Sequence, residues 1–220
     1  TGDKVIDSIK EVESELKKPI TKFTWVEILL FFAPKVSSTA FKALASIGFF
    51  RDFDGRITRN KAIYDYEIYR TLTKAEQTWV QKNYEDNKWT NFVDCLKSLA
   101  PTKKEGGGTS KIARKQIVEN EIQLLLDPPF SLEDDPGWII DQETRFLGCP
   151  VTMTKIDTAD KSAANTTCKE IVNGKKGKNL CVVGNVQRIA DYTISKGDSK
   201  GQAMAFLTIE DDTCSLDSVV

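Results

Sequence analysis

The sequence predicts an α+β fold in which a mainly helical region precedes a smaller region of strands. Three observations support this prediction for the 220-residue chain. Apolar residues recur at helical spacing through residues 1–100. Helical segments broken by Gly and Pro continue through residues 101–178. β-branched and apolar runs dominate residues 179–220. We therefore expect a helical domain, a helical connector with flexible loops, and a β domain, with those boundaries.

Punctuating residues divide the first region into helices. Thr24 is a suitable N-cap, Pro19 and Pro34 stop helices, and Gly48 is placed to end one. Asp54-Gly55 marks a turn. The expected helices cover residues 5–16, 25–32, 38–47 (starting at Ser37 or Ser38), 58–71 and 74–99.

The middle region alternates helices with loops. Its three consecutive glycines, Gly106 to Gly108, predict a flexible loop over residues 101–110. A helix over residues 110–126 should end at Pro128, and one over residues 138–147 at Gly148. The polar stretch 162–178 is predicted to be a linker or an exposed excursion of the chain. From residue 179, strands are expected over 181–189 and 205–209, and 213–220 is a candidate third strand.

Composition excludes several kinds of chemistry. The chain has no histidine, which removes Ser-His triads and His metal ligands. Its five cysteines form no CxxC pair, so we expect reduced thiols, a cytoplasmic setting and no metal site. The strongest apolar run, residues 26–33, is too short for a membrane span, so no membrane partner is expected.

Charge is unevenly distributed although the net charge is only −1. Residues 169–200 hold seven basic and three acidic side chains, whereas residues 127–143 hold six acidic and no basic ones. A nucleic-acid phosphate would be attracted to the first stretch and repelled from the second. A solvated charged surface is the alternative for both.

An internal repeat carries the first candidate site. Residues 1–9 align with residues 36–44, each a tight turn before a helix with apolar residues at matching positions. This pattern resembles the helix-hairpin-helix motif, in which unpaired N–H groups at a helix N-terminus hold a DNA phosphate. An ordinary capped helix pair is the alternative. The candidate duplex-binding residues are Thr1, Gly2, Asp3, Lys4, Lys35, Ser37, Ser38, Thr39, Arg56 and Arg59.

Three ordered matches indicate a larger resemblance. Residues 36–53 keep a Leu-x-x-x-Gly-x-Phe spacing, residues 141–151 form a connector, and residues 182–213 read as strand, turn, strand and acidic turn. Together they resemble the C-terminal region of a C-family (bacterial-type) replicative DNA polymerase, the DNA polymerase III alpha subunit. The resemblance implies a tandem helix-hairpin-helix domain followed by part of an OB-fold barrel. The family's Lys-Arg at the second hairpin is absent, and the divergence would suit a phage-encoded polymerase.

The OB resemblance implies a single-strand-binding sheet face. OB folds use basic grooves and exposed aromatic rings for this purpose, and the candidates are Arg188, Tyr192, Lys196, Lys200 and Phe206. Phe206 also suits a core position. Because an OB barrel needs five strands, the remaining strands are expected outside this chain.

A sliding-clamp peptide is a further interpretation. Gln123 and Leu126 resemble the start of a Gln-x-x-Leu-Phe-like clamp-binding motif, although the terminal aromatic is missing and Phe130 comes three residues late. The alternative is that these residues form one ordinary helix.

The resulting hypothesis is the DNA-binding part of a replicative polymerase, with the primer-template, the single-stranded template and the rest of the polymerase as partners. No catalytic residue is assigned, so the fragment should be inactive alone, and Mg²⁺ is expected only in the missing catalytic domain. A non-enzymatic single-strand-binding replication protein and a protein-interaction scaffold are the competing hypotheses.

Overall fold

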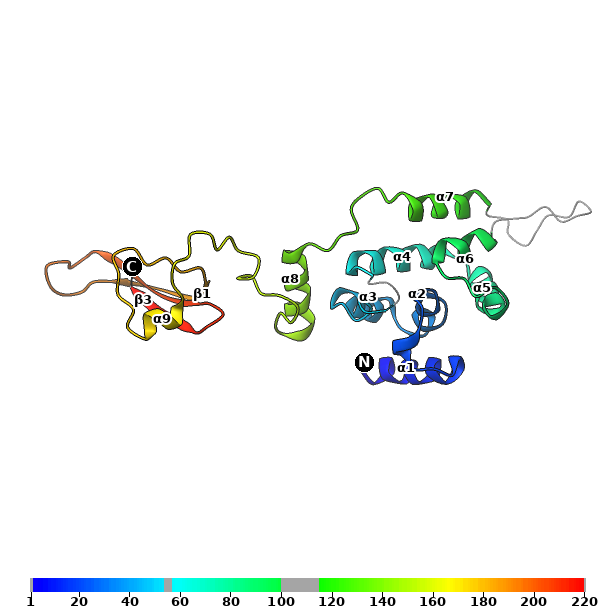
Figure 1. Ribbon diagram of the computed structural model, residues 1–220, viewed down its shortest axis with the longest axis horizontal. Coiled ribbons are helices and arrows are strands. Elements are labelled where there is room, and N and C mark those ends of the chain that lie inside the picture. Colours follow the sequence, from blue (N-terminus) through cyan, green and yellow to red (C-terminus); the bar gives the residue numbers. More distant parts are fainter. Residues whose placement is uncertain (1, 54–56, 100–114, 220) are drawn as a thin grey trace, which may run out of the picture. The chain divides into compact units, whose positions relative to one another are not determined.

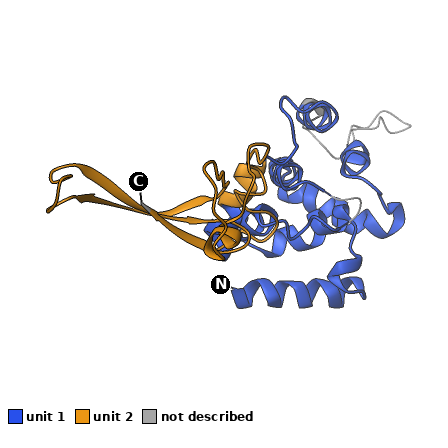
Figure 2. Ribbon diagram, turned by 60° about the vertical axis from the view of Figure 1, so that its left-hand side comes forward, with its two compact units in different colours: residues 1–135, 142–148 blue, residues 136–141, 149–220 orange. Residues whose placement is uncertain are grey.

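The computed structural model describes residues 2–53, 57–99 and 115–219. The fold is α+β, with helices followed by a three-stranded antiparallel sheet (Figure 1). The chain divides into two compact units, which we call the helical unit (residues 1–135 and 142–148) and the sheet unit (residues 136–141 and 149–220; Figure 2). The region expected as a separate connector is therefore divided between the two units.

The first half of the helical unit contains α-helices, two short 3-10 helices and a π-helix. Its elements are α1 (Gly2–Leu16), η1 (Ile20–Lys22), α2 (Trp25–Glu27), the π-helical η2 (Ile28–Phe32), η3 (Ala33–Lys35) and α3 (Ser38–Ser46). The predicted cap at Thr24 is confirmed, because its side chain accepts from the Glu27 N–H while the Glu27 carboxylate accepts from the Thr24 N–H.

Gly48 ends α3 as predicted. Its φ is +78°, its N–H bonds to the Ala45 carbonyl at 3.0 Å, and the Phe49 N–H bonds to the Leu44 carbonyl at 3.0 Å. These two bonds are the Schellman pattern, which a glycine adopts without strain. At the end of α1 the Lys18 N–H bonds to the Glu13 carbonyl at 3.3 Å, and the residue with positive φ is Lys17, at 53°.

The second half of the helical unit corrects one prediction. Residues 74–99 form two helices, α5 (Lys74–Asn87) and α6 (Phe92–Leu99), rather than one. Lys88 adopts φ 43° at the end of α5, and the Asn91 side chain accepts from the Asp94 N–H at 2.9 Å to begin α6. The other helices are α4 (Arg59–Thr71), α7 (Lys115–Leu126) and α8 (Pro136–Leu147), and the residues of α8 are divided between the two units.

The core of the helical unit is rich in aromatic side chains. Phe41 lies at its centre, with its ring 4.0 Å from the ring of Tyr66 and 4.9 Å from that of Phe50, both stacked. Trp25 packs against the rings of Phe41 and Phe50 and donates its indole N–H to the Asp65 carboxylate at 2.8 Å. Burial of this cluster holds α2, α3 and α4 together.

The chain after α7 returns to the N-terminal end of α4. The Asp134 carboxylate accepts from the N–H groups of Arg59 and Asn60, both at 2.9 Å, and the Thr58 hydroxyl donates to the Leu132 carbonyl at 2.7 Å. A carboxylate 75 residues away thus caps α4 together with Thr58.

The sheet unit contains a short helix that the sequence analysis missed. α9 (Cys168–Val172) lies within the stretch that we expected to be a linker, and a capping box between Thr167 and Glu170 begins it. The Thr-x-x-Glu spacing was the available signal. Hydrogen bonds to Glu170 from Lys175, Thr166 and the Thr167 N–H lower the pKa of this exposed carboxyl to about 2.

The sheet is a meander of β1 (Asn185–Thr193), β2 (Ala203–Glu210) and β3 (Ser215–Val219) in that order. The expected third strand is therefore present. A bulge at Gln187 shifts the register of β1 on β2. At the β2–β3 turn, the Asp211 carboxylate accepts from the N–H groups of Cys168, Thr213 and Cys214, which ties α9 to the sheet. Although burial opposes the effect, these bonds lower the pKa of Asp211.

Candidate nucleic-acid interface

Three of the predicted single-strand-binding residues share one face of the sheet. Arg188 pairs with Thr208, Ala190 with Phe206, and Tyr192 with Met204. Residues directly opposite each other in an antiparallel pair point to the same face, and alternate residues along a strand do so too. Arg188, Tyr192 and Phe206 therefore lie on one face, which we call the aromatic face.

The two rings of the aromatic face contact each other and remain exposed. Tyr192 and Phe206 are each 47% exposed, and their ring centroids are 6.2 Å apart at an interplanar angle of 65°. Phe206 is therefore not a core residue in this structure. Exposed rings beside an exposed arginine can stack on nucleic-acid bases and attract phosphates.

The turn between β1 and β2 carries the other two candidates. Lys196 and Lys200 are exposed in a turn closed by bonds from the Ile194 N–H to the Gln202 carbonyl, 3.0 Å, and from the Gly201 N–H to the Ile194 carbonyl, 2.8 Å. Gly201 adopts φ +87° there, and Gly197 φ +84°. The turn follows Tyr192 directly, and the Tyr192 hydroxyl lies 3.3 Å from that of Ser195.

The opposite face of the sheet is aliphatic. Val186 pairs with Ile209 and Ile189 with Leu207, and the side chains of Val186 and Ile189 are 53% and 63% exposed. This face carries no aromatic ring among the described strand residues. The chemistry suited to bases is thus confined to the aromatic face.

The candidates around the first helix are exposed. Gly2, Asp3 and Lys4 occupy the first turn of α1, and Thr1 lies outside the described residues. Asp3 places a negative charge at this helix end. This charge interacts favourably with the helix dipole but repels a phosphate. Lys4 is the residue of this group that could attract a phosphate.

The candidates around the second hairpin are mostly engaged within the protein. The Ser37 side chain caps α3 by accepting from the Ala40 N–H. The Lys35 ammonium binds the carboxylates of Glu11, at 2.6 Å, and Glu15, at 3.2 Å. Partial burial acts to lower the pKa of Lys35, but the two carboxylates outweigh this effect, so the pKa is raised. Thr39 is exposed in the first turn of α3.

Arg70 is a residue at this hairpin that sequence reasoning missed. Its guanidinium donates to the Ser38 hydroxyl at 3.0 Å, lies over the Tyr66 ring at 5.9 Å, and remains half exposed. Arg70 belongs to α4, 32 residues away from Ser38. No local pattern could have placed it beside Ser38, where it supplies a positive charge with the Glu67 carboxylate 3.8 Å away.

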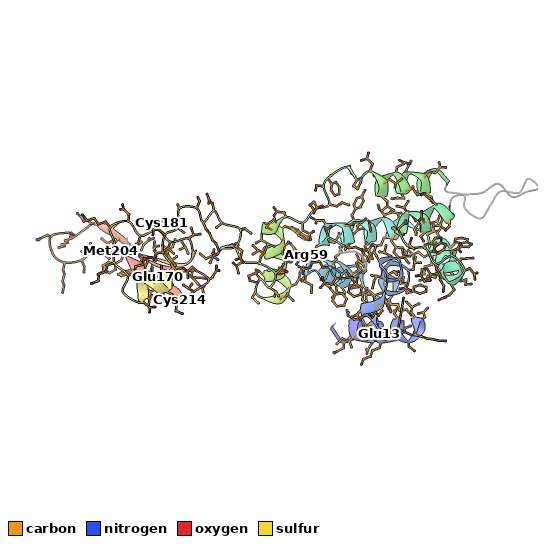
Figure 3. The ribbon with its side chains drawn as sticks, in the orientation of Figure 1. Glu13, Arg59, Glu170, Cys181, Met204 and Cys214 are labelled. Atoms are coloured by element: carbon orange, nitrogen blue, oxygen red, sulfur yellow. The ribbon has the colours of Figure 1, made fainter. Side chains whose placement is uncertain are left out.

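Arg59 has an internal role rather than a surface one. Its side chain is 3% exposed and binds the carboxylates of Glu143, at 2.6 Å, and Asp134, at 3.6 Å. Figure 3 labels Arg59 within the helical part of the chain. A phosphate could reach this guanidinium only after these contacts break, so we do not include Arg59 in the candidate interface. The same contacts neutralise two of the six acidic residues counted between 127 and 143. Arg56 lies outside the described residues.

The candidate clamp-binding residues are exposed on α7. Gln123 is exposed and Leu126 is 58% exposed, although Ile122 is buried on the same helix. Phe130 is 60% exposed and packs edge to face on Tyr64, with ring centroids 5.5 Å apart. Leu126 and Phe130 therefore present apolar surface near the end of α7.

No group of three or more His, Cys, Asp or Glu side chains among the described residues could hold a metal ion. None of their helices is both long and apolar enough to cross a membrane.

Comparison with known proteins gave no match to any family, curated protein or solved structure.

Proposed function

We propose that the chain binds single-stranded DNA on the aromatic face of its sheet, as the DNA-binding region of a C-family replicative polymerase. The observation that carries this proposal is the placement of Arg188, Tyr192 and Phe206 on one exposed face, next to a turn with two lysines. Rings and cations arranged in this way bind single strands with little sequence preference, which suits a template path.

The helical unit supports a second DNA contact in the same proposal. A helix (α2 and η2), a short turn and the Ser37-capped helix α3 follow one another in the order of a helical hairpin, with Arg70 beside Ser38. Duplex phosphates would approach the N-terminal ends of α1 and α3, near Lys4 and Arg70. The tandem hairpin and the OB fold remain parts of this proposal. A clamp contact through Gln123, Leu126 and Phe130 would extend it.

Fluorescence anisotropy with a primer-template, matched single strands and matched duplex, over a salt series, tests the proposal. Tyr192→Ala and Phe206→Ala should each weaken single-strand binding by about 1–3 kcal/mol, roughly 5- to 150-fold in Kd. Val186→Ala is the matched control, because Val186 is similarly exposed on the aliphatic face of β1.

Charge-reversal variants separate the contacts. Lys196→Glu and Lys200→Glu should weaken single-strand binding and flatten its salt dependence, whereas Lys4→Glu and Arg70→Glu should act on duplex binding. Preference for the primer-template junction supports the polymerase assignment, and preference for single strands alone favours a replication accessory protein. Absence of binding at low salt would exclude DNA binding by this chain and leave an interaction scaffold.

A further inference from the structure

In the part of the chain that the structure describes, the outer edge of β1 is open over its whole length. The strand order makes β1 an edge strand, and within the described part of the chain its only backbone ladder is the one with β2. Among the described residues, no backbone hydrogen bond from outside β2 reaches residues 185–193. Seven of its nine residues are exposed, so neither face shields the edge. An edge of this kind is a template for another strand.

We propose that two copies of this chain associate by antiparallel pairing of their β1 strands, with Ala190 on the two-fold axis. The result is a continuous six-stranded sheet. A two-fold axis perpendicular to the sheet keeps each face on its own side, so the aromatic faces of the two copies join. This proposal does not depend on DNA binding, but it competes with closure of an OB barrel, because further barrel strands would pair with the open edges of the same sheet.

The bulge and the charges of β1 select this register. A two-fold pairing must centre on a residue, because directly opposite side chains lie on the same face. A centre on Ile189 or an earlier residue would place the bulged Gln187 inside the ladder, where pairing is disrupted, whereas a centre on Ala190 leaves Gln187 at the end of the ladder, opposite Thr193. A centre on Asp191 would oppose two identical carboxylates, and one on Tyr192 would oppose Arg188 with Lys196, both of which are unfavourable.

The register centred on Ala190 avoids these conflicts and adds a favourable contact. It places Arg188 of each copy opposite Tyr192 of the other, on the aromatic face. A guanidinium next to a tyrosine ring is attracted by the ring's negative face, and the two-fold axis makes this contact twice. Ile189 of each copy then lies diagonal to its symmetry mate, which shields part of its 63% exposed side chain.

Sedimentation equilibrium without DNA tests the association. We expect a weak dimer whose fraction rises with protein concentration. Ile189→Asp places a second carboxylate opposite Asp191 of the other copy and should weaken dimerisation about tenfold or more. Val186→Asp is the matched control on the same face, outside the paired stretch, and should leave the dimer unchanged. A wild-type chain that stays monomeric up to about 1 mM would overturn the proposal.

Crosslinking tests the register. In a Cys149→Ser, Cys181→Ser, Cys214→Ser background, Ala190→Cys should give a covalent dimer with a short bismaleimide. Thr193→Cys should not, because its two copies would lie about 20 Å apart along the strands. Equal crosslinking at both positions would overturn the register. Circular dichroism of each variant confirms folding, so that loss of the dimer is not mistaken for unfolding.

Discussion

Arg59 of α4 and Glu143 of α8 form an ion pair of 2.6 Å whose side chains are only 3% and 1% exposed. Asp134 lies on the other side of the same guanidinium and also caps α4. Gly48 leaves room for this arrangement, because a Cβ atom there would lie 3.0 Å from the Arg59 guanidinium. One arginine thus joins α4, the segment after α7 and α8 within the helical unit.

Glu143→Ala should destabilise the helical unit by about 3 kcal/mol or more, because it removes a buried carboxylate that neutralises Arg59. Urea unfolding followed by tryptophan fluorescence measures this loss, since Trp25, Trp79 and Trp89 lie in the helical unit. Glu67→Ala is the control, because its pairs with Lys42 and Arg70 are more than 40% exposed on both sides and should each contribute under about 1 kcal/mol. Equal losses in both variants would contradict the buried-pair argument. The double variant Arg59→Leu, Glu143→Leu should recover much of the loss.

Asp65→Asn should stabilise the protein increasingly as the pH rises from acid to neutral. Burial raises the pKa of Asp65, and its bonds to Lys61 and Trp25 only partly offset this effect. A carboxyl with a raised folded-state pKa contributes stability that is fully present below the unfolded pKa of about 3.9 and is lost as the pH passes the raised value. An asparagine keeps an acceptor for Trp25 and carries no charge at any pH.

Unfolding midpoints of the wild type and Asp65→Asn between about pH 3.5 and 7 measure the difference, because this range begins below the unfolded pKa of aspartate. Asp86→Asn, at an exposed position of α5, is the surface control. A difference that stays constant across the range would show that Asp65 does not titrate differently in the folded protein.

Lys17→Gly should raise the free energy of unfolding by about 1 kcal/mol. Lys17 holds a φ of 53°, where the Lys18 N–H bonds to the Glu13 carbonyl at 3.3 Å to close the end of α1. A side chain with a Cβ is strained in this conformation and glycine is not. Lys17→Ala removes the same charge but keeps the Cβ, so it should bring no such gain in a thermal or urea unfolding experiment.

Helix ends were predictable wherever a local signal marked them. Thr24, Ser37 and Thr58 each cap the helix that follows, and Gly48 and Gly148 end helices with positive φ. The break between α5 and α6 was missed because Lys88 adopts a left-handed conformation, and a lysine in the sequence gives no signal for that conformation. α9 was missed because its capping box lies in a polar stretch.

Charged residues were the least predictable part of the candidate site. Lys35 binds carboxylates 20 and 24 residues away along the chain, Arg70 reaches a hydroxyl 32 residues away, and Arg59 pairs with Glu143 across 84 residues. The sequence shows the charge of such a side chain but not its partner. The structure therefore removes Arg59 from the candidate interface and adds Arg70 to it.

The sequence by itself determined the α+β class, most helix boundaries and the presence of strands in the last region, because caps, positive-φ glycines and β-branched runs act on neighbouring residues. Only the tertiary structure decided which side chains are free to meet a ligand. Strand register placed Arg188, Tyr192 and Phe206 on one face, and long-range packing buried Arg59. Both depend on contacts between segments far apart in the chain, whose free energy no local pattern encodes.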